Sequence, residues 1–341
     1  MVLYILSMSD NNLSKVAIDI LSKTILAADE STSTIKKRFD SIGVESTPEK
    51  NREYRQLLFI SRDIEKYVSG VILYDETVYQ KSDDGKTLPQ LLASKSINPG
   101  IKVDRKTIQL YGFGEDTFTQ GLDDLGERLL EYKKHGCVFA KWRAVYTISE
   151  NSPSDLAIKR NACDLALYAL LCQQAGIVPI VEPEVMMEGE HTFEQNKEVT
   201  ENVLNVVFEK LSNYGVDMRG IILKPNMITA GKDNLSQLSK EEVAQETLNI
   251  LQKTVHKDVP GIAFLSGGQT PDQATENLNE INKLKNKNPQ LYPWRLTASY
   301  GRALQGETLE AWKGKKENIE NAQKVFISRA EKVYQASLGQ L

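Results

Sequence analysis

The chain is poor in the residues that bind transition metals. Its 341 residues include three histidines and three cysteines, namely His135, His191, His256, Cys137, Cys163 and Cys172. None of them forms an HxH, HExxH or CxxC spacing, so the local sequence does not support a zinc or iron site. An odd number of cysteines without a CxxC pair favours reduced thiols in a reducing compartment. We therefore expect no metal and no other cofactor.

Charge of one sign and long apolar runs are also lacking. The formal net charge is only −4, which argues against a nucleic-acid partner. No apolar stretch is long enough to span a bilayer. The opening residues MVLYILSMSD are too short an apolar run, without a basic region, for a signal peptide, and Met8 could equally be the natural start. We expect a cytoplasmic protein that does not bind membranes.

The chain does contain eight short apolar segments bounded by glycine, proline or polar residues. They begin at Thr24, Gly70, Ile101, Cys137, Ile177, Gly220, Gly261 and Trp294. Amphipathic helix patterns separate most of them, for example at residues 51–68, 120–135 and 154–175. Such alternation indicates a parallel sheet, and the length suits a single-domain α/β fold, a (β/α)8 TIM barrel.

No change in composition suggests a linker that would divide this barrel. We expect an N-terminal extension and leading helix over residues 1–20, followed by the barrel and a C-terminal helix over residues 21–341. The alternative is a doubly wound open sheet, which usually shows a GxGxxG near its first strand, and this chain has none. The glycine-containing stretch from Gly112 is polar and typical of a loop.

Polar side chains stand at the carboxyl ends of these predicted strands, where a barrel builds its active site. They are Asp29, Asp75, Lys102, Lys141, Arg143, Glu182, Glu184, Lys224, Ser266 and Arg302. A structural role would explain several of them singly: a turn cap for Asp29, an ion network for the two glutamates, and a surface clamp for Arg143. We interpret Asp75 as structural. Together, however, so many charges at one end of a sheet indicate a functional site.

Lys224 is the most informative of these residues. It ends the apolar run GIILKPN, and an unpaired buried ammonium costs several kcal/mol, about enough to make a lysine give up its proton. A lysine that reaches water past the strand end is the structural alternative. Because strand side chains alternate, Lys141 and Arg143 share one face of their strand, as do Glu182 and Glu184 on the next strand. If these faces line the lumen, Lys224 lies among another ammonium and two or three carboxylates. A second ammonium and several carboxylates are an environment that makes a lysine nucleophilic.

Two strand ends are suited to binding phosphate. SGGQTPDQA from Ser266 is a glycine turn that leads into a helix, whose start is marked by Thr270 and Pro271. SYGRALQ from Ser299 repeats this arrangement, with Arg302 able to make a forked contact. Backbone N–H groups at such helix starts point at an anion. Phosphate sites after the seventh and eighth strands are common in barrels.

Eleven short motifs occur in order between about Ser22 and Ala322. They are LAADEST, YRQLLF, TLPQLL, PGIKVD, TQGLDDL, FAKWR, GIVPIVEPE, LKPNM, FLSGGQ, SYGRAL and GKKEN. Through these motifs the chain resembles class I fructose-bisphosphate aldolases. The family implies a (β/α)8 barrel that forms a homotetramer. It acts in glycolysis without a metal, and it reversibly cleaves fructose 1,6-bisphosphate to dihydroxyacetone phosphate and glyceraldehyde 3-phosphate through a lysine Schiff base.

The resemblance also implies roles for individual residues. Lys224 would form the Schiff base, with Asp29, Lys141, Glu182 and Glu184 as the other catalytic residues. The substrate-binding residues would be Arg143, then Ser266, Gly267, Gly301 and Arg302 at the 1-phosphate, and Ser31, Thr34 and Lys102 at the 6-phosphate. Lys37 and Arg38 would lie near the 6-phosphate.

The chain departs from the family in two places. It has Ser33-Thr34 where the family usually has Gly-Ser, which keeps a hydroxyl but loses the most flexible residue. Family members also typically continue into a mobile tail that ends in tyrosine, whereas the last tyrosine here, Tyr334, falls inside the expected final helix. We therefore carry over no role for a terminal tyrosine, and the acid that protonates the enamine is left open.

Two rival interpretations are consistent with parts of the sequence. One is another lysine-imine barrel, such as a transaldolase-like or deoxyribose-phosphate aldolase-like enzyme, although two phosphate sites argue against it. The other is a non-catalytic barrel that serves as a scaffold, which the complete set of Lys224, Lys141, Glu182 and Asp29 argues against. A second, binding role beside catalysis stays open.

Overall fold

The structure is a computed structural model that describes the backbone of residues 3–341 and the side chains of residues 12–341. Eight parallel strands close into a barrel in the order β1-β10-β9-β8-β7-β6-β3-β2. They are β1 (Thr24–Ala28), β2 (Val68–Leu73), β3 (Asn98–Lys102), β6 (Phe139–Tyr146), β7 (Val178–Val185), β8 (Ile222–Leu223), β9 (Gly261–Phe264) and β10 (Arg295–Tyr300). The expected single-domain (β/α)8 barrel is confirmed, and each of its strands overlaps one of the eight predicted segments.

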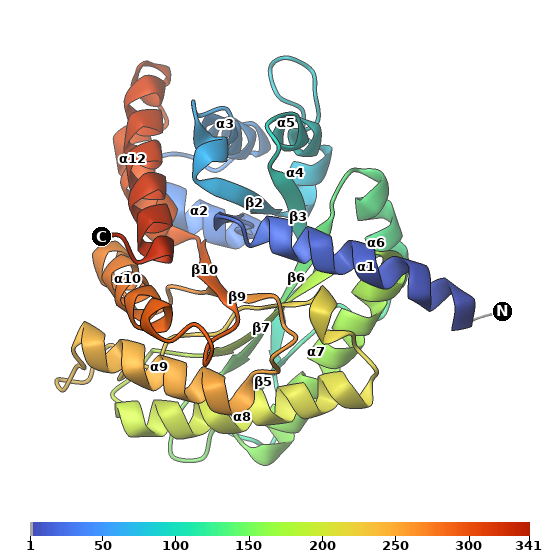
Figure 1. The fold of residues 1–341 in the computed structure, drawn as a ribbon. Helices are drawn as coiled ribbons and strands as arrows, with labels where there is room; N and C mark the ends of the chain where they lie inside the picture. The colour runs from blue at the N-terminus through green and yellow to red at the C-terminus, as the bar shows by residue number, and fades with distance from the viewer. Residues whose placement is uncertain (1–2) are drawn as a thin grey trace.

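Helices cover the barrel, most of them on its outer face (Figure 1). They are α1 (Leu3–Ile20), α2 (Thr32–Asp40), α3 (Pro48–Phe59), α4 (Asp75–Tyr79), α5 (Leu88–Ser94), α6 (Leu125–Lys134), α7 (Asp155–Ala175), α8 (Phe193–Asn213), α9 (Lys240–Thr254), α10 (Pro271–Lys287), α11 (Arg302–Trp312) and α12 (Ile319–Leu338). Short 3-10 turns are η1 (Ile64–Lys66), η2 (Met218–Gly220) and η3 (Lys316–Asn318). Of the predicted N-terminal segment, residues 3–20 form α1, and residues 1–2 lie outside the described residues.

Local capping signals fix the helix starts. The side chain of Thr47 accepts a hydrogen bond from the backbone of Lys50, and Pro48 follows it in the first turn of α3. Thr270 caps α10 in the same way, and Gln273 returns the contact as a capping box. These hydroxyls satisfy backbone N–H groups that a helix start leaves without partners.

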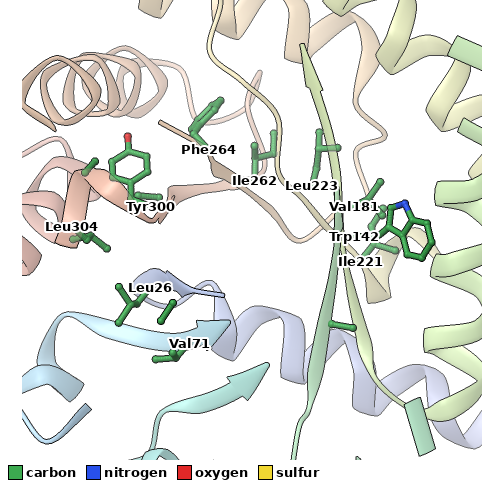
Figure 2. Close-up of a cluster of buried hydrophobic side chains, with 14 of the residues drawn as sticks. Leu26, Val71, Trp142, Val181, Ile221, Leu223, Ile262, Phe264, Tyr300 and Leu304 are labelled. Atoms are coloured by element: carbon green, nitrogen blue, oxygen red, sulfur yellow. The ribbon is translucent and has the colours of Figure 1, made fainter. Parts of the chain in front are cut away.

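Alternating strand side chains divide the apolar residues into two layers. Outward-facing residues such as Trp142, Val181 and Leu223 are fully buried between the strands and the surrounding helices, and Figure 2 shows part of this layer. Inward-facing residues such as Ile25 and Phe139 form a second, smaller cluster inside the barrel. Apolar side chains therefore cover both faces of the strands toward the amino end of the barrel.

Helix α1 closes the amino end of the barrel. Its residues Leu13, Ala17 and Ile20 belong to the same buried cluster as Ile25 and Phe139. Figure 1 shows α1 lying across the strands at this end. Because the amino end is filled with apolar side chains, access to the lumen is from the carboxyl ends of the strands.

The stretch that follows β3 contains a hairpin that the sequence did not predict. Strands β4 (Thr107–Gln109) and β5 (Thr117–Thr119) pair antiparallel, with Thr107 opposite Thr119. Each strand has three residues, too few for an apolar alternation to show in the sequence. The Thr119 hydroxyl donates to the carbonyl oxygen of Arg143 at 2.8 Å, so the hairpin is attached to β6 near the mouth of the barrel.

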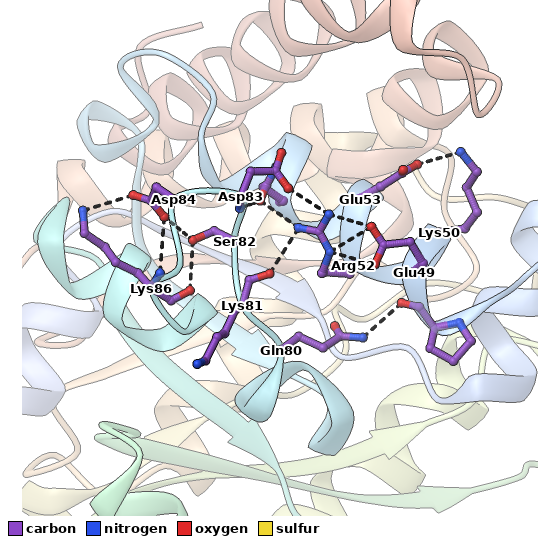
Figure 3. Close-up of polar contacts among 12 residues, drawn as sticks. Glu49, Lys50, Arg52, Glu53, Gln80, Lys81, Ser82, Asp83, Asp84 and Lys86 are labelled. Atoms are coloured by element: carbon purple, nitrogen blue, oxygen red, sulfur yellow. Dashed lines mark hydrogen bonds and ion pairs between the residues drawn. The ribbon is translucent and has the colours of Figure 1, made fainter.

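A charged network attaches the loop between α4 and α5 to α3 (Figure 3). The Arg52 guanidinium lies 2.7 Å from Glu49 and 2.9 Å from Asp83, and it donates to the carbonyl oxygen of Lys81 at 3.1 Å. Its hydrogen bond to Glu49 and the further contact with Asp83 raise the pKa of Arg52 above its usual range. The network lies on the outer surface and supports the fold rather than the barrel mouth.

Gly100 on β3 provides a test of packing inside the barrel. A Cβ at this position would lie 2.2 Å from the ring of Phe139, whereas a Cβ at Gly126 in α6 would meet nothing within 4 Å. Gly100→Ala should therefore lower the free energy of unfolding by about 1–3 kcal/mol through overpacking. Gly126→Ala should raise it by up to about 1 kcal/mol because alanine loses less chain entropy in a helix. Urea unfolding of both variants measures the difference, and a harmless Gly100→Ala would contradict the packing described.

Candidate active site

The lumen changes from apolar to charged along each strand. On β6 the inward side chains are Phe139, then Lys141, then Arg143, and on β7 Ile180 is followed by Glu182. Parallel pairing places Lys141 beside Lys102 of β3 and Arg143 beside Glu182 of β7 in register. The same period of two that fills the lower lumen with apolar groups therefore brings the predicted ionisable residues together at the carboxyl end.

Lys224 lies at the end of β8 and contacts one carboxylate closely. Its Nζ is 3.0 Å from Oε1 of Glu182, and both side chains are 5% exposed. Its backbone N–H donates to the carbonyl oxygen of Val181 at 2.8 Å, which continues the barrel pairing and fixes the direction of the side chain. The lysine thus points into the lumen and does not reach past the strand end toward solvent.

Lys141 is surrounded by three carboxylates. Its Nζ lies 2.9 Å from Asp29, 3.5 Å from Glu182 and 3.6 Å from Asp104. Burial alone would lower the pKa of this ammonium, but the three carboxylates outweigh burial and raise the pKa above the ordinary value. Lys141 is therefore a permanent cation in the centre of the site.

The pKa values of the two aspartates, Asp29 and Asp104, shift downward, opposite to the pKa of Lys141. Burial alone would raise the pKa of Asp29, but the ammonium groups of Lys141 and Lys224 hold it below the ordinary value. The pKa of Asp104 is lowered against the effect of burial by Lys141 and Lys102. Both aspartates are therefore ionised at neutral pH.

Arg143 and Glu184 form a second ion pair beside the first cluster. The guanidinium Nε contacts the Glu184 carboxylate, and the pair raises the pKa of Arg143 although its burial acts to lower it. Glu184 in turn lies against the glycine turn after β9, where a Cβ on Gly267 would be 2.8 Å from Oε1. Only a residue without a side chain lets this turn approach the carboxylate so closely.

The predicted phosphate-binding turns follow β9 and β10. Ser266 and Gly267 precede α10, and Gly301 precedes Arg302 at the start of α11. Gly301 provides no side-chain cap, so the first N–H groups of α11 are available to an anion. Ser299 lines the same region, and its buried hydroxyl oxygen has no hydrogen-bond partner within the described residues.

Hydroxyl groups line another part of the mouth, after β1. Ser31 caps α2, and its hydroxyl lies 3.0 Å from that of Thr34 and 3.1 Å from that of Ser33. Lys102, at the end of β3, lines the same cavity, and its ammonium pairs with Asp104. Backbone and hydroxyl donors at a helix start, with a lysine in the same cavity, are suited to a phosphate.

One cavity of about 530 Å³ joins these regions. The thirteen residues expected to be catalytic or substrate-binding all line it, from Asp29 after β1 to Arg302 after β10. Eight basic and five acidic side chains line the cavity, a formal excess of three positive charges in a protein with net charge −4. The excess positive charge of the cavity therefore favours the binding of an anion.

Asp104 and Glu30 also line the cavity, although they were not predicted from the sequence. Asp104 contacts both Lys102 and Lys141, and its position two residues after Lys102 in PGIKVD places it on the same side of the chain. Glu30 is 6% exposed and pairs with Arg38, while Gln305 donates to it at 2.9 Å. Neighbouring acidic residues such as Asp29-Glu30 give no local signal as to which one enters the lumen.

Several residues lie outside the cavity. Asp75 begins α4 and accepts a hydrogen bond from the Tyr132 hydroxyl at 2.7 Å, in agreement with a structural role. Lys37, expected near the 6-phosphate, does not line the cavity, whereas Arg38 does. Tyr334 packs in α12 with its ring 6.1 Å from that of Tyr67, which precedes β2 at the amino end of the barrel.

Two further features concern the part of the chain that the structure describes. Within it, no group of three or more histidine, cysteine, aspartate or glutamate side chains has an arrangement that could hold a metal ion. None of its helices combines the length and the apolar character that a bilayer crossing requires.

Comparison with known proteins identifies the family. Residues 12–341 match the glycolytic family described as fructose-bisphosphate aldolase class-I. The chain belongs to the class I fructose-bisphosphate aldolase family. The predicted resemblance is therefore confirmed, and the reaction is the reversible cleavage of fructose 1,6-bisphosphate through a lysine Schiff base.

Individual relatives agree with this assignment over most of their length. The chain is 50% identical to cytosolic fructose-bisphosphate aldolase 4 of Arabidopsis thaliana over 317 residues, covering 93% of this chain and 80% of the relative. It is 50% identical to the fructose-bisphosphate aldolase of Schistosoma mansoni over 339 residues, covering 98% and 92%. A solved structure of the Plasmodium falciparum aldolase, in complex with TRAP and a small-molecule inhibitor, superposes with a TM-score of 0.94 at 45% identity, covering 97% and 95%.

The lowered pKa of Asp104 generates a prediction about acid stability. A carboxylate whose pKa is lower in the folded state stabilises the fold above its unfolded pKa, and the contribution disappears as the pH falls toward the folded pKa. Asp104→Asn should lower the free energy of unfolding by about 1–3 kcal/mol near neutral pH. The variant should also lose less stability than the unchanged protein between about pH 5 and pH 3.

Urea unfolding across this pH window measures both effects. Asp123→Asn is the matched control, because Asp123 is exposed and lies outside the cavity. It should leave the free energy of unfolding at neutral pH unchanged. An Asp104→Asn variant with the acid slope of the unchanged protein would contradict the charge arrangement around Lys141.

Proposed function

We propose that Lys224 is the residue that forms the Schiff base in this chain. The observation that carries the proposal is a buried amine in the centre of a positively charged cavity, 3.0 Å from a carboxylate that can take its proton. A neutral amine can attack the C2 ketone of the open-chain sugar bisphosphate. Glu182 accepts and returns protons as the carbinolamine forms and loses water to give the protonated imine.

Cleavage then requires a base at the C4 hydroxyl and an electron sink at C2. The protonated imine on Lys224 is the sink, so the electrons of the C3–C4 bond move toward nitrogen as the C4 hydroxyl loses its proton. We assign this deprotonation to Glu182, assisted by Asp29, because both carboxylates form ion pairs with the same cation, Lys141. Breaking the bond releases glyceraldehyde 3-phosphate and leaves an enamine of dihydroxyacetone phosphate on Lys224.

Lys141 supplies fixed charge rather than a proton. Its raised pKa keeps it cationic, so it can stabilise the negative charge that develops on the substrate oxygens. Glu184, paired with Arg143, orients that arginine toward the cavity and balances the charge beside Glu182. A cation already surrounded by carboxylates needs little rearrangement during the reaction.

The two ends of the cavity suit the two phosphates. We assign the 1-phosphate to Ser266, Gly267, Gly301 and Arg302, on the turns after β9 and β10. We assign the 6-phosphate to the hydroxyl-rich start of α2, with Ser31 and Thr34, together with Lys102. Two anion-binding regions and an excess of positive charge favour a bisphosphate over the single phosphate of transaldolase-like substrates.

Assembly and location follow from the family in the same way. We propose a homotetramer, as implied by the resemblance, and a cytoplasmic location, which the cytosolic name of the Arabidopsis relative supports. Light scattering on the purified protein measures the number of subunits, and fractionation of the source cells measures the location. A monomeric mass or an organellar distribution would contradict these two proposals without affecting the chemistry.

Two substitutions separate the proposed roles. Lys224→Met removes the nucleophile at similar side-chain length, so it should abolish turnover. Arg302→Ala removes a phosphate contact only, and should raise KM about tenfold while kcat falls much less. Steady-state cleavage of fructose 1,6-bisphosphate measures both constants, and circular dichroism verifies folding. Equal losses of kcat in the two variants with unchanged KM would contradict the assigned roles.

A further inference from the structure

Most basic groups of the cavity are already paired with carboxylates. Six of the eight form ion pairs, as Arg105 does with Asp124 and Lys102 with Asp104. Among the side chains of residues 12–341, Lys106 and Arg302 have no such pair. These two cations therefore account for charge in the cavity that no carboxylate of the protein neutralises locally.

The two unpaired cations belong to different sectors of the barrel mouth. Arg302 begins α11 directly after β10, beside the turns to which we assigned the 1-phosphate. Lys106 lies between β3 and β4, beyond Lys102 on the same segment. In the barrel order, β2 and β1 separate β3 from β10. Lys106 is thus placed at the end of the cavity to which we assigned the 6-phosphate.

The backbone around Lys106 is held in place although its side chain is exposed. Its carbonyl oxygen accepts a hydrogen bond from the N–H of Gln120 at 2.9 Å, and the next residue, Thr107, pairs with Thr119 in the hairpin. Gly121 adopts φ +127° and packs so closely that a Cβ there would lie 3.2 Å from the backbone nitrogen of Arg105. The backbone from which the Lys106 side chain extends is therefore held in a fixed position at the mouth of the barrel.

We propose that Lys106 binds the 6-phosphate of fructose 1,6-bisphosphate, which is also the phosphate of glyceraldehyde 3-phosphate, and makes the site selective for phosphorylated aldehydes. A phosphate monoester carries about −1.5 to −2 charges at neutral pH, and an ammonium without a competing carboxylate is free to approach it. Lys102, by contrast, must share its charge with Asp104. This inference rests on the proposed function, because it uses the assignment of the two ends of the cavity.

The reverse reaction tests this inference directly, because the aldehyde can be supplied with or without its phosphate. Lys106→Met removes the charge and keeps the length of the side chain. For condensation of dihydroxyacetone phosphate with glyceraldehyde 3-phosphate, it should lower kcat/KM about three- to tenfold, mainly through KM. With unphosphorylated glyceraldehyde, kcat/KM should stay within about twofold of the value for the unchanged protein, because this aldehyde has no phosphate for Lys106 to contact. Lys106→Arg should restore most of the loss.

A matched control excludes a general effect of surface charge. Lys36→Met removes an exposed ammonium on α2 that pairs with Asp40 and does not line the cavity. This variant should have the kcat/KM of the unchanged protein with both aldehydes. Equal losses with both aldehydes in Lys106→Met, or no loss with glyceraldehyde 3-phosphate, would overturn the inference and leave Lys106 as a solvated surface lysine.

Adduct formation distinguishes a failure here from a failure of the proposed function. Borohydride trapping of dihydroxyacetone phosphate involves the 1-phosphate end and Lys224 only, so Lys106→Met should form the adduct at the rate of the unchanged protein. If the unchanged protein forms no adduct, the proposed function fails. If adducts form normally and the aldehyde selectivity does not change, only the role of Lys106 fails.

Discussion

The ammonium of Lys141 lies between Asp29, Asp104 and Glu182, all within 3.6 Å, at the carboxyl end of a barrel whose other end is filled with apolar side chains. A buried cation of this kind is stable only where carboxylates surround it. Those carboxylates come from three separate strands or strand ends: Asp29 follows β1, Asp104 follows β3 and Glu182 lies on β7. The closed barrel brings β1, β3, β6 and β7 together around this one charge.

The proposed chemistry depends on this arrangement. Glu182 contacts both Lys141 and Lys224, so the fixed charge of Lys141 acts on the carboxylate that we propose exchanges protons with Lys224. Lys141 keeps its proton because three acids oppose the effect of burial. Lys224 forms an ion pair with Glu182 within the described residues, and we propose it as the amine that takes part in the covalent chemistry. The different carboxylates around Lys141 and Lys224 thus account for the different roles that we propose for these two lysines.

Much of this site could be predicted from the sequence because barrel strands and active-site residues follow the same period. The eight apolar segments gave the strands, and the residue at each carboxyl end, such as Lys224 after Ile222-Leu223, gave the candidates that meet in one cavity. The hairpin of β4 and β5 could not be predicted, since three-residue strands carry no periodic signal. Asp104 was missed because its partners, Lys102 and Lys141, become neighbours only when β3 pairs with β6.

The central claim is that one particular lysine carries the substrate. The most direct measurement is reduction with borohydride in the presence of dihydroxyacetone phosphate, followed by proteolysis and mass mapping of the modified peptide. The account predicts a single added triose phosphate on the peptide that contains Lys224, and none on the peptide that contains Lys141. Modification of Lys141, or an even distribution over surface lysines, would contradict it.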